Sequence, residues 1–187
     1  MKALLDACVL FPTVLREILV GVAEQGLFTP LWSPRLLEEW ARAARRFGPE
    51  DEAIARADAA VLDARFPAAS VMPEAGLLRR LHLPDEDDIH VLAAAVTAGA
   101  DVIVTFNAAD FPRAALAAEG IARRDPDAFL RALWADHPGP VAAAVETVRA
   151  RAERLSGQTH PRRALLRRAR LPRLGRALDP RGGDGRG

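Results

Sequence analysis

Short apolar runs alternate with helical segments along the first 124 residues, and this alternation restricts the fold more than any other feature of the chain. The candidate strands lie at residues 2–6, 27–32, 69–72 and 102–105. The segments between them repeat apolar residues at helical spacing, most clearly at residues 12–25, 34–47, 50–65 and 85–98. Strands that alternate with helices form parallel α/β sheets. We therefore predict a three-layer α/β/α sandwich with a parallel sheet.

The pattern becomes entirely helical after residue 124, which divides the chain into three parts. We predict an α/β domain at residues 1–124 and a helical C-terminal extension at residues 125–178. Residues 179–187 contain four glycines and a proline and are predicted to be a disordered tail.

Charge is distributed unevenly between the body of the chain and its end. From Pro161 onward there are nine arginines and two aspartates, a net charge of +7, so the first 160 residues carry −6 against an overall charge of +1. This predicts a charge-dense site in the body and an anionic contact for the arginine-rich end, for which a merely solvated helix is the alternative.

The composition argues against disulfide-bonded or cysteine-zinc proteins and against membrane or secreted proteins. The single cysteine, Cys8, cannot form an internal disulfide or a cysteine-based zinc site. No apolar run approaches the roughly 18 residues of a membrane span, and Asp6 interrupts any signal-peptide pattern. We expect a cytoplasmic protein with no membrane contact.

Two aspartates follow predicted strands. Asp6 comes after the first strand, and Asp110 comes shortly after the strand at residues 102–105. Ligand groups in open α/β sheets lie beyond the carboxyl ends of strands, so both carboxylates are candidates for a functional site. Thr105 and Asn107 would supply neutral oxygen atoms beside Asp110.

Helical phase selects two further acids. Glu39 lies next to the apolar stripe of its helix, whereas Glu38 has an exposed partner four residues later in Arg42. Asp88 heads the apolar stripe of the helix at residues 85–98, and an inward carboxylate requires a counter-charge or a metal. The helix dipole partly explains the run of acids before Asp88, of which those at positions 86 and 87 are expected to point outward.

Together, the four selected acids favour metal-dependent chemistry. Clustered carboxylates repel one another and suit a hard divalent cation, Mg²⁺ or Mn²⁺. Such an ion polarises a phosphoryl group and activates water, which points to phosphodiester hydrolysis. Two other classes with an aspartate after the first strand, receiver domains and haloacid-dehalogenase-type phosphatases, need a lysine near the site. The only lysine of the chain is Lys2, so the sequence argues against both classes.

Two further polar residues are less informative. His90 is turned about 200° from Asp88 on the same helix, so we expect it on the surface. Arg16 either touches the site or RNA, or is an ordinary exposed helix arginine.

The segments that carry these acids resemble the motifs of PIN domains. Residues 4–10 (LLDACVL) resemble the first motif, and residues 33–39 (SPRLLEE) resemble the second, in which the glutamate six residues after the serine is the acid. Residues 84–105 resemble the third block, with Asp88 as the matching acid, and Asn107 with Asp110 resembles the closing motif. The resemblance covers residues 1 to about 125 in the order of the family.

The resemblance implies a nuclease. It assigns both catalysis and metal binding to Asp6, Glu39, Asp88 and Asp110, with Thr105 and Asn107 in support. Its implied function is Mg²⁺-dependent hydrolysis of RNA by an endoribonuclease, and the alternative is a non-catalytic RNA- or protein-binding module. Many members carry an aspartate where Asn107 stands, which implies weaker metal binding at that corner.

The helical extension adds a more specific resemblance. A PIN domain followed by such an extension is similar to the VapC-type toxins of toxin–antitoxin pairs. This likeness implies a cognate antitoxin as a partner and a homodimer as an oligomeric state.

Overall fold

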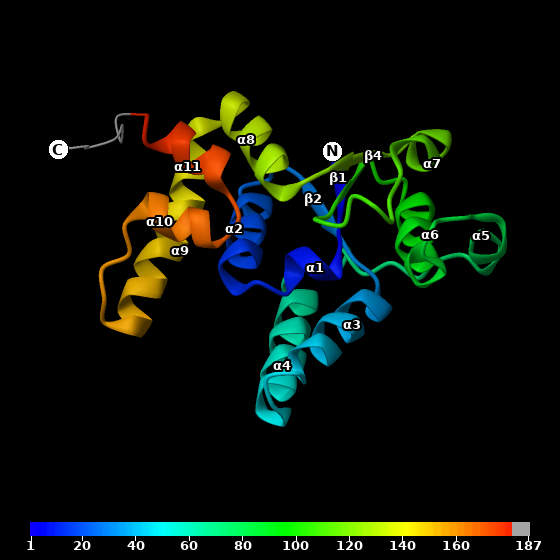
Figure 1. Ribbon diagram of the computed structural model, residues 1–187, viewed down its shortest axis with the longest axis horizontal. Helices are drawn as coiled ribbons and strands as arrows, with labels where there is room; N and C mark the ends of the chain where they lie inside the picture. Colours follow the sequence, from blue (N-terminus) through cyan, green and yellow to red (C-terminus); the bar gives the residue numbers. More distant parts are fainter. Residues whose placement is uncertain (181–187) are drawn as a thin grey trace. The chain divides into compact units, whose positions relative to one another are not determined.

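The computed structural model describes residues 1–180, which form two compact units (Figure 1). One unit consists of Met1–Phe11 and Phe28–Asp125 and contains the whole sheet; we call it the sheet unit. The other consists of Pro12–Leu27 and the chain from Pro126 onward; we call it the helical unit.

The sheet has four parallel strands in the order β2-β1-β3-β4. The strands are β1 (Lys2–Leu5), β2 (Thr29–Leu31), β3 (Val102–Val104) and β4 (Ala122–Arg124). From β1 the chain passes to one side to form β2 and later to the other side to form β3. The carboxyl ends of β1 and β3 therefore flank a topological switch point, where open α/β sheets bind ligands.

Helices flank this sheet, which confirms the predicted α/β class with a parallel sheet. In the sheet unit they are α1 (Ala7–Leu10), α3 (Pro34–Ala44), α4 (Pro49–Arg65), α5 (Ala75–Arg80), α6 (Ile89–Ala98) and α7 (Arg113–Ala118). The Ser33 hydroxyl accepts a hydrogen bond from the Leu36 backbone N–H (3.2 Å) and so caps α3. Gly99 ends α6 in a left-handed conformation (φ 62°) that favours glycine.

The predicted and observed strands differ at two places. The expected strand at residues 69–72 is wrong, because only Ser70 forms an isolated bridge, to Trp32. Conversely, β4 was not predicted. It has an exposed–intermediate–exposed pattern with two arginines, and it is held by backbone hydrogen bonds to β3 rather than by apolar burial.

The helical unit has five helices within its described residues. They are α2 (Thr13–Glu24), α8 (Pro126–Asp136), α9 (Pro138–Ser156), α10 (Arg162–Arg168) and α11 (Pro172–Leu178). Helix α2 packs on α9, and α11 packs on both α8 and α10. Four leucines of α10, α11 and the turn between them are buried, so these last helices belong to the core of the unit: Leu165, Leu166, Leu171 and Leu174.

A buried carboxylate joins two of these helices. Asp127, near the start of α8, is 5% exposed and accepts hydrogen bonds from the backbone N–H groups of Arg173 (2.8 Å) and Leu174 (2.9 Å). These two N–H groups belong to the first turn of α11, where helices lack internal acceptors. Asp127 therefore fixes the start of α11 against α8.

Arg16 and the chain end bear on two expectations from the sequence. Arg16 on α2 is buried, and its Nε lies 3.9 Å from Glu17 Oε1, so an exposed helix arginine is the wrong interpretation.

Of the expected disordered tail at residues 179–187, only Asp179 and Pro180 are described, and the Asp179 carboxylate accepts hydrogen bonds from the Arg162 guanidinium. The rest of the expected tail lies outside the described residues.

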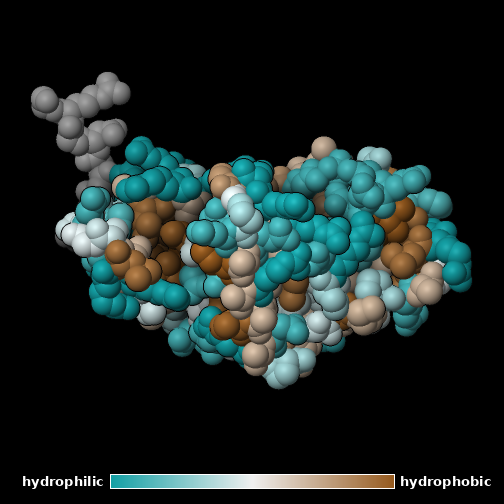
Figure 2. All heavy atoms as spheres, turned by 90° about the horizontal axis from the view of Figure 1, so that it is seen from below, coloured by the Kyte–Doolittle hydropathy of each residue, from teal (hydrophilic) through white to brown (hydrophobic). Residues whose placement is uncertain are grey.

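Large hydrophobic side chains on the surface are dispersed. On the face in Figure 2, brown hydrophobic areas are separated by teal hydrophilic side chains. The exposed ones include Phe47, Ile54, Val61, Met72 and Leu155. Singly exposed residues of this kind are ordinary on protein surfaces. Among the helices of residues 1–180, none has the length and apolar character to cross a membrane.

Candidate metal centre

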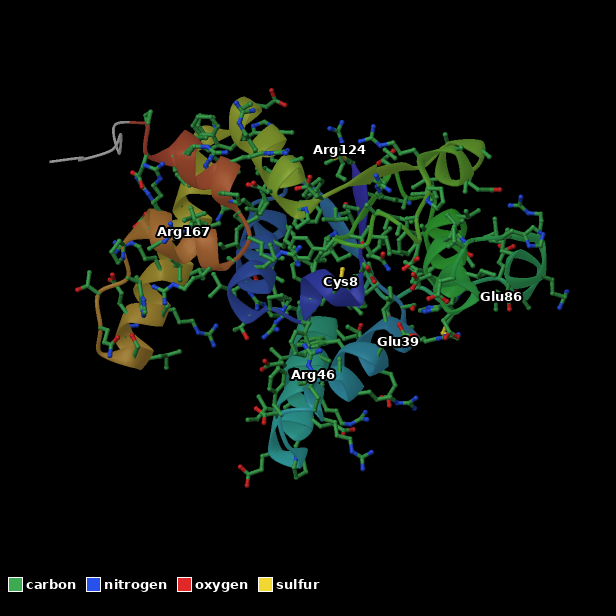
Figure 3. The ribbon with its side chains drawn as sticks, in the orientation of Figure 1. Cys8, Glu39, Arg46, Glu86, Arg124 and Arg167 are labelled. Atoms are coloured by element: carbon green, nitrogen blue, oxygen red, sulfur yellow. The ribbon has the colours of Figure 1, made fainter. Side chains whose placement is uncertain are left out.

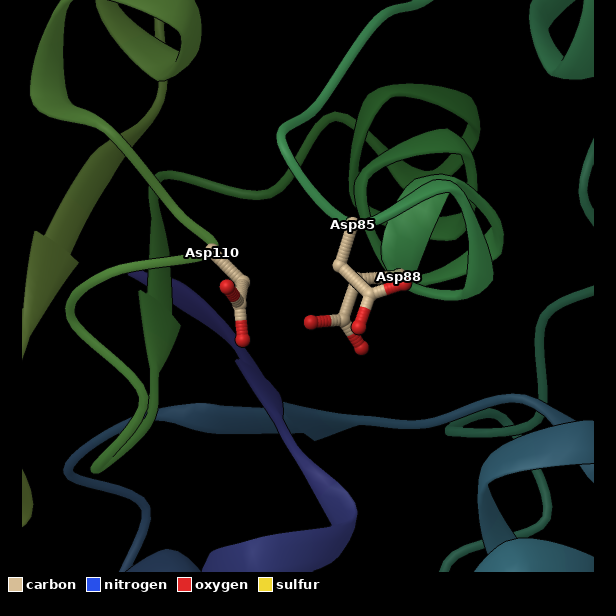
Figure 4. Close-up of side chains that lie close together, drawn as sticks. All are labelled: Asp85, Asp88 and Asp110. Carbon is tan, nitrogen blue, oxygen red and sulfur yellow. The ribbon is translucent and has the colours of Figure 1, made fainter.

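Three aspartates from two separate segments converge beyond the sheet. Asp85 and Asp88 precede α6, and Asp110 follows β3. One carboxylate oxygen of each lies within 4.8 Å of the others, and the carboxylates point toward one another (Figure 4). Within residues 1–180, none of the three forms an ion pair with an arginine or lysine. The centre therefore has unneutralised negative charge.

Asp6 is fixed at the end of β1 by its neighbours. Leu5 is paired with Val104 in the sheet, which brings the next residues of the two strands side by side. The Thr105 hydroxyl donates to Asp6 Oδ2 (2.6 Å), and the Cys8 thiol donates to the same oxygen (3.0 Å). Burial, together with the charge of Asp6, raises the pKa of Cys8 to about 12, so the thiol keeps its proton.

Electrostatics link Asp6 to the three converging aspartates. Burial, followed by the charges of Asp6, Asp85 and Asp110, raises the pKa of Asp88 to about 6. Three acids thus act on the fourth, Asp88, and we call all four the carboxylate cluster. Such a raised pKa is the result expected of like charges that share a site.

Asn107 lies between two members of the carboxylate cluster. Its side-chain Nδ2 donates to the Asp110 carboxylate and, at 3.4 Å, to Asp88 Oδ2. Its backbone N–H donates to the Thr105 hydroxyl (2.9 Å), which in turn holds Asp6. Asn107 and Thr105 therefore contact three of the cluster's carboxylates, and their supporting role in metal binding stays a prediction.

Glu39 lies outside the converging group. Its Oε1 is 2.9 Å from Arg35 Nε and 3.0 Å from His90 Nε2. Partial burial would raise the pKa of Glu39, but its contacts with His90 and Arg35 outweigh burial and lower that pKa. Of the four predicted acids, the structure brings together Asp6, Asp88 and Asp110, and the role of Glu39 as a metal ligand stays a prediction.

His90 is buried, so its expected place on the surface is wrong. Its side chain is 4% exposed. Most of its neighbours in α6 are buried too, so this helix is covered on nearly every side. The face turned away from Asp88 meets Glu39 of α3 instead of solvent. The His90–Glu39 contact lies outside hydrogen-bond geometry, and within residues 1–180 neither ring nitrogen has a hydrogen-bond partner.

Asp85 was missed because the local helix type differs from the expected one. Residues Glu86–Asp88 form a 3₁₀ helix (η1) ahead of α6, with Asp85 as its N-cap. Asp85 lies just outside this short helix with an extended backbone, and the tight turn that follows leaves its carboxylate near that of Asp88. The run of four acids, which exceeds what a helix dipole needs, was the signal in the sequence.

The donor set fits a hard divalent cation. Asp85, Asp88 and Asp110 offer only carboxylate oxygens, the ligands that Mg²⁺ and Mn²⁺ prefer. Burial and repulsion by the neighbouring carboxylates raise the pKa of Asp88, and a bound cation would relieve that repulsion. These three aspartates could hold the ion, with Asp6 beside them.

A parallel α/β fold with a carboxylate cluster at its switch point defines a class of α/β proteins with a candidate site for a divalent metal. The sequence matches the family model of the PIN domain over residues 2–109, more than half of the chain, and the protein belongs to this family. The matched segment contains Asp6, Asp85 and Asp88 and ends one residue before Asp110. No match was found among curated proteins, and none among solved structures.

Proposed function

We propose that this PIN-domain protein is an endoribonuclease that uses Mg²⁺ or Mn²⁺ to hydrolyse RNA phosphodiesters. The observation that carries the proposal is the convergence of Asp85, Asp88 and Asp110, with oxygens within 4.8 Å and no neutralising arginine or lysine in the described chain. PIN domains are in general metal-dependent nucleases, and this donor set suits that chemistry.

A bound divalent ion would supply polarisation of the phosphoryl group and activation of water. Neighbouring side chains orient the carboxylates that would bind the ion. Thr105 fixes the orientation of Asp6, and Asn107 orients Asp110 toward Asp88. Because the pKa of Cys8 is about 12, its thiol is neutral near pH 7 and is a poor nucleophile, which favours attack by water.

The proposal is tested by cleavage of a mixed RNA pool by purified protein. Cleavage is expected with Mg²⁺ or Mn²⁺ and is expected to stop in a chelator, because in the proposed mechanism the ion polarises the phosphoryl group and activates water. The Asp88→Asn variant controls for contaminating nucleases and should be inactive. Cleavage that survives in the chelator and in Asp88→Asn alike would contradict the mechanism.

We also propose that the protein is the toxin of a toxin–antitoxin pair, with a cognate antitoxin as partner and a homodimer as its state. Support comes from the PIN domain followed by helices α8 to α11. Expression in a bacterial host should arrest growth, and co-expression of the product of a small adjacent reading frame should restore it. Equal growth with wild type and Asp88→Asn would argue against a toxin.

A further inference from the structure

A groove of about 560 Å³ lies between α7 and the edge strand β4. Three of its lining residues are arginines, Arg113, Arg123 and Arg124, and the others are small or apolar. Among the described residues, no carboxylate lines it. Arg124 lies on β4 at the edge of the sheet (Figure 3).

Two of these arginines have no counter-charge within the part of the chain that the structure describes. Arg113 and Arg124 are exposed, and neither forms an ion pair or side-chain hydrogen bond within residues 1–180. In contrast, many other arginines of the sheet unit are paired, such as Arg80 with Glu119 (2.7 Å). Concentrated positive charge of this kind attracts anions.

The third arginine connects the groove to the carboxylate cluster. Arg123 Nη1 donates to the backbone carbonyls of Ala108 and Phe111, which lie on either side of Asp110 in the sequence. The loop that carries Asp110 therefore forms part of both features. Arg123 serves to hold this loop, so its guanidinium is less available to a ligand than the other two.

Sheet register places Arg124 at the same end of the sheet as the cluster. Arg124 is paired with Val104, which is paired with Leu5, and its carbonyl accepts from the Thr105 N–H (3.0 Å). With strands about 4.8 Å apart, Arg124 lies about 10 Å across the sheet from Leu5, the residue before Asp6. A polynucleotide spans such a distance within a few nucleotides.

We propose that this groove is a phosphate-binding subsite that holds the backbone of single-stranded RNA while the bond to be cleaved lies at the carboxylate cluster. The inference rests on the proposed nuclease function. A cluster of unneutralised carboxylates repels a polyanionic substrate, so positive charge nearby is needed to retain it. Guanidinium groups match phosphate geometry, and the alanines and glycine of the lining leave room for a close approach.

The test is RNA binding by the full chain in a chelator, so that cleavage does not interfere. Fluorescence anisotropy with a short labelled single-stranded RNA is measured over a range of salt concentrations. The variant is Arg113→Gln with Arg124→Gln, and Arg123 is left intact because it holds the Asp110 loop. The matched control is Arg79→Gln with Arg154→Gln, two exposed arginines that are likewise unpaired within residues 1–180.

Loss of two phosphate contacts should lower the slope of log K against log salt by about 1.4, because each contact on a single strand contributes about 0.7. The control should keep the wild-type slope, and thermal unfolding should show that both variants are folded. A wild-type slope in the groove variant would overturn the subsite.

The same samples separate this inference from the proposed function. If wild type cleaves RNA with Mg²⁺ but the groove variant keeps its slope, the nuclease stands and the subsite is overturned. If wild type does not cleave but binding depends on Arg113 and Arg124, the subsite stands and the nuclease is overturned. If wild type does not bind RNA, the subsite is overturned, and an acidic peptide becomes the occupant to examine.

Discussion

At the residue scale, Asp88 shows that the candidate site is electrostatically unfavourable in the metal-free protein. Its carboxylate is half-buried beside three others, and this environment raises its pKa to about 6. Near neutral pH the folded protein therefore holds a charge that burial and its neighbours oppose. A centre of this kind is stabilised by a bound cation rather than by its own contacts.

Replacement of Asp88 should stabilise the metal-free protein. Because the folded-state pKa lies above the usual 3.8, the penalty is absent at acidic pH and grows as the pH rises from about 4 to about 6. With allowance for solvent screening, Asp88→Asn should raise the free energy of unfolding at pH 7 by about 1 kcal/mol, or Tm by about 2–4 °C.

Thermal unfolding in a chelator at pH 4.5 and at pH 7 checks this prediction. The variant should gain more over wild type at the higher pH, and added Mn²⁺ should stabilise wild type alone. If the variant and wild type have the same Tm at pH 4.5 and also at pH 7, the charge of Asp88 does not destabilise the folded protein.

A second residue-scale prediction concerns which acids bind the ion. Asp85→Asn should weaken Mn²⁺ binding by at least about tenfold, the lower end of the loss seen when only supporting residues are changed. Glu39→Gln should have a smaller effect, because Arg35 and His90 already occupy its carboxylate. Isothermal titration calorimetry measures both, with the highly exposed Asp87→Asn as the control. A greater loss from Glu39→Gln would show that Glu39 moves into the centre when the ion binds.

The sequence was sufficient for the acids whose position depends on the ends of strands. Asp6 and Asp110 were predicted because parallel strands bring their carboxyl ends together, whatever the helices do. Asp85 and His90 depend on finer features. A 3₁₀ turn left the Asp85 carboxylate near that of Asp88, and the burial of α6 on nearly every side placed His90 against Glu39. Neither feature has a signature in apolar periodicity.

At the scale of elements, apolar pattern identified the elements that are buried. Strands β1 and β3 and helix α6 were predicted from it, and all three are largely buried. Strand β4 and helix α7 were not predicted, because they are short and mostly exposed. Yet these two elements form the arginine-lined groove. The elements that the sequence did not predict therefore lie at the exposed edge of the sheet.

The contact between α8 and α11 gives the prediction at this scale. Asp127→Ala should lower the free energy of unfolding by about 1–3 kcal/mol, because two backbone N–H groups, one buried and one partly buried, lose their acceptor. Asp127→Asn keeps one acceptor oxygen and should lose less. Urea unfolding followed by circular dichroism measures both variants. Wild-type stability in Asp127→Ala would mean that water replaces the carboxylate.

For the whole molecule, the arginine-rich end is both structural and exposed. Arg162 is tied to Glu146 (3.1 Å) and to Asp179, so part of the positive charge serves the packing of the helical unit. Leu165 and Leu166 of α10 and Leu174 of α11 are buried, so removal of residues from 161 onward would damage the core of that unit. Single substitutions are therefore the appropriate test of the anionic contact that the charge distribution predicts.

Three exposed arginines of these helices have no ion-pair partner within residues 1–180: Arg167, Arg168 and Arg176. If this surface contacts RNA, replacement of all three by glutamine should reduce the slope of log K against log salt by about 2, at about 0.7 for each lost contact on a single strand. Anisotropy with labelled RNA in a chelator measures the slope, and Arg79→Gln with Arg154→Gln is again the control. Because the carboxylate cluster is unaltered, RNA cleavage at saturating substrate should remain at the wild-type rate. An unchanged slope with intact cleavage would show that these arginines are only solvated, and that the charge of the C-terminal helices has no part in binding RNA.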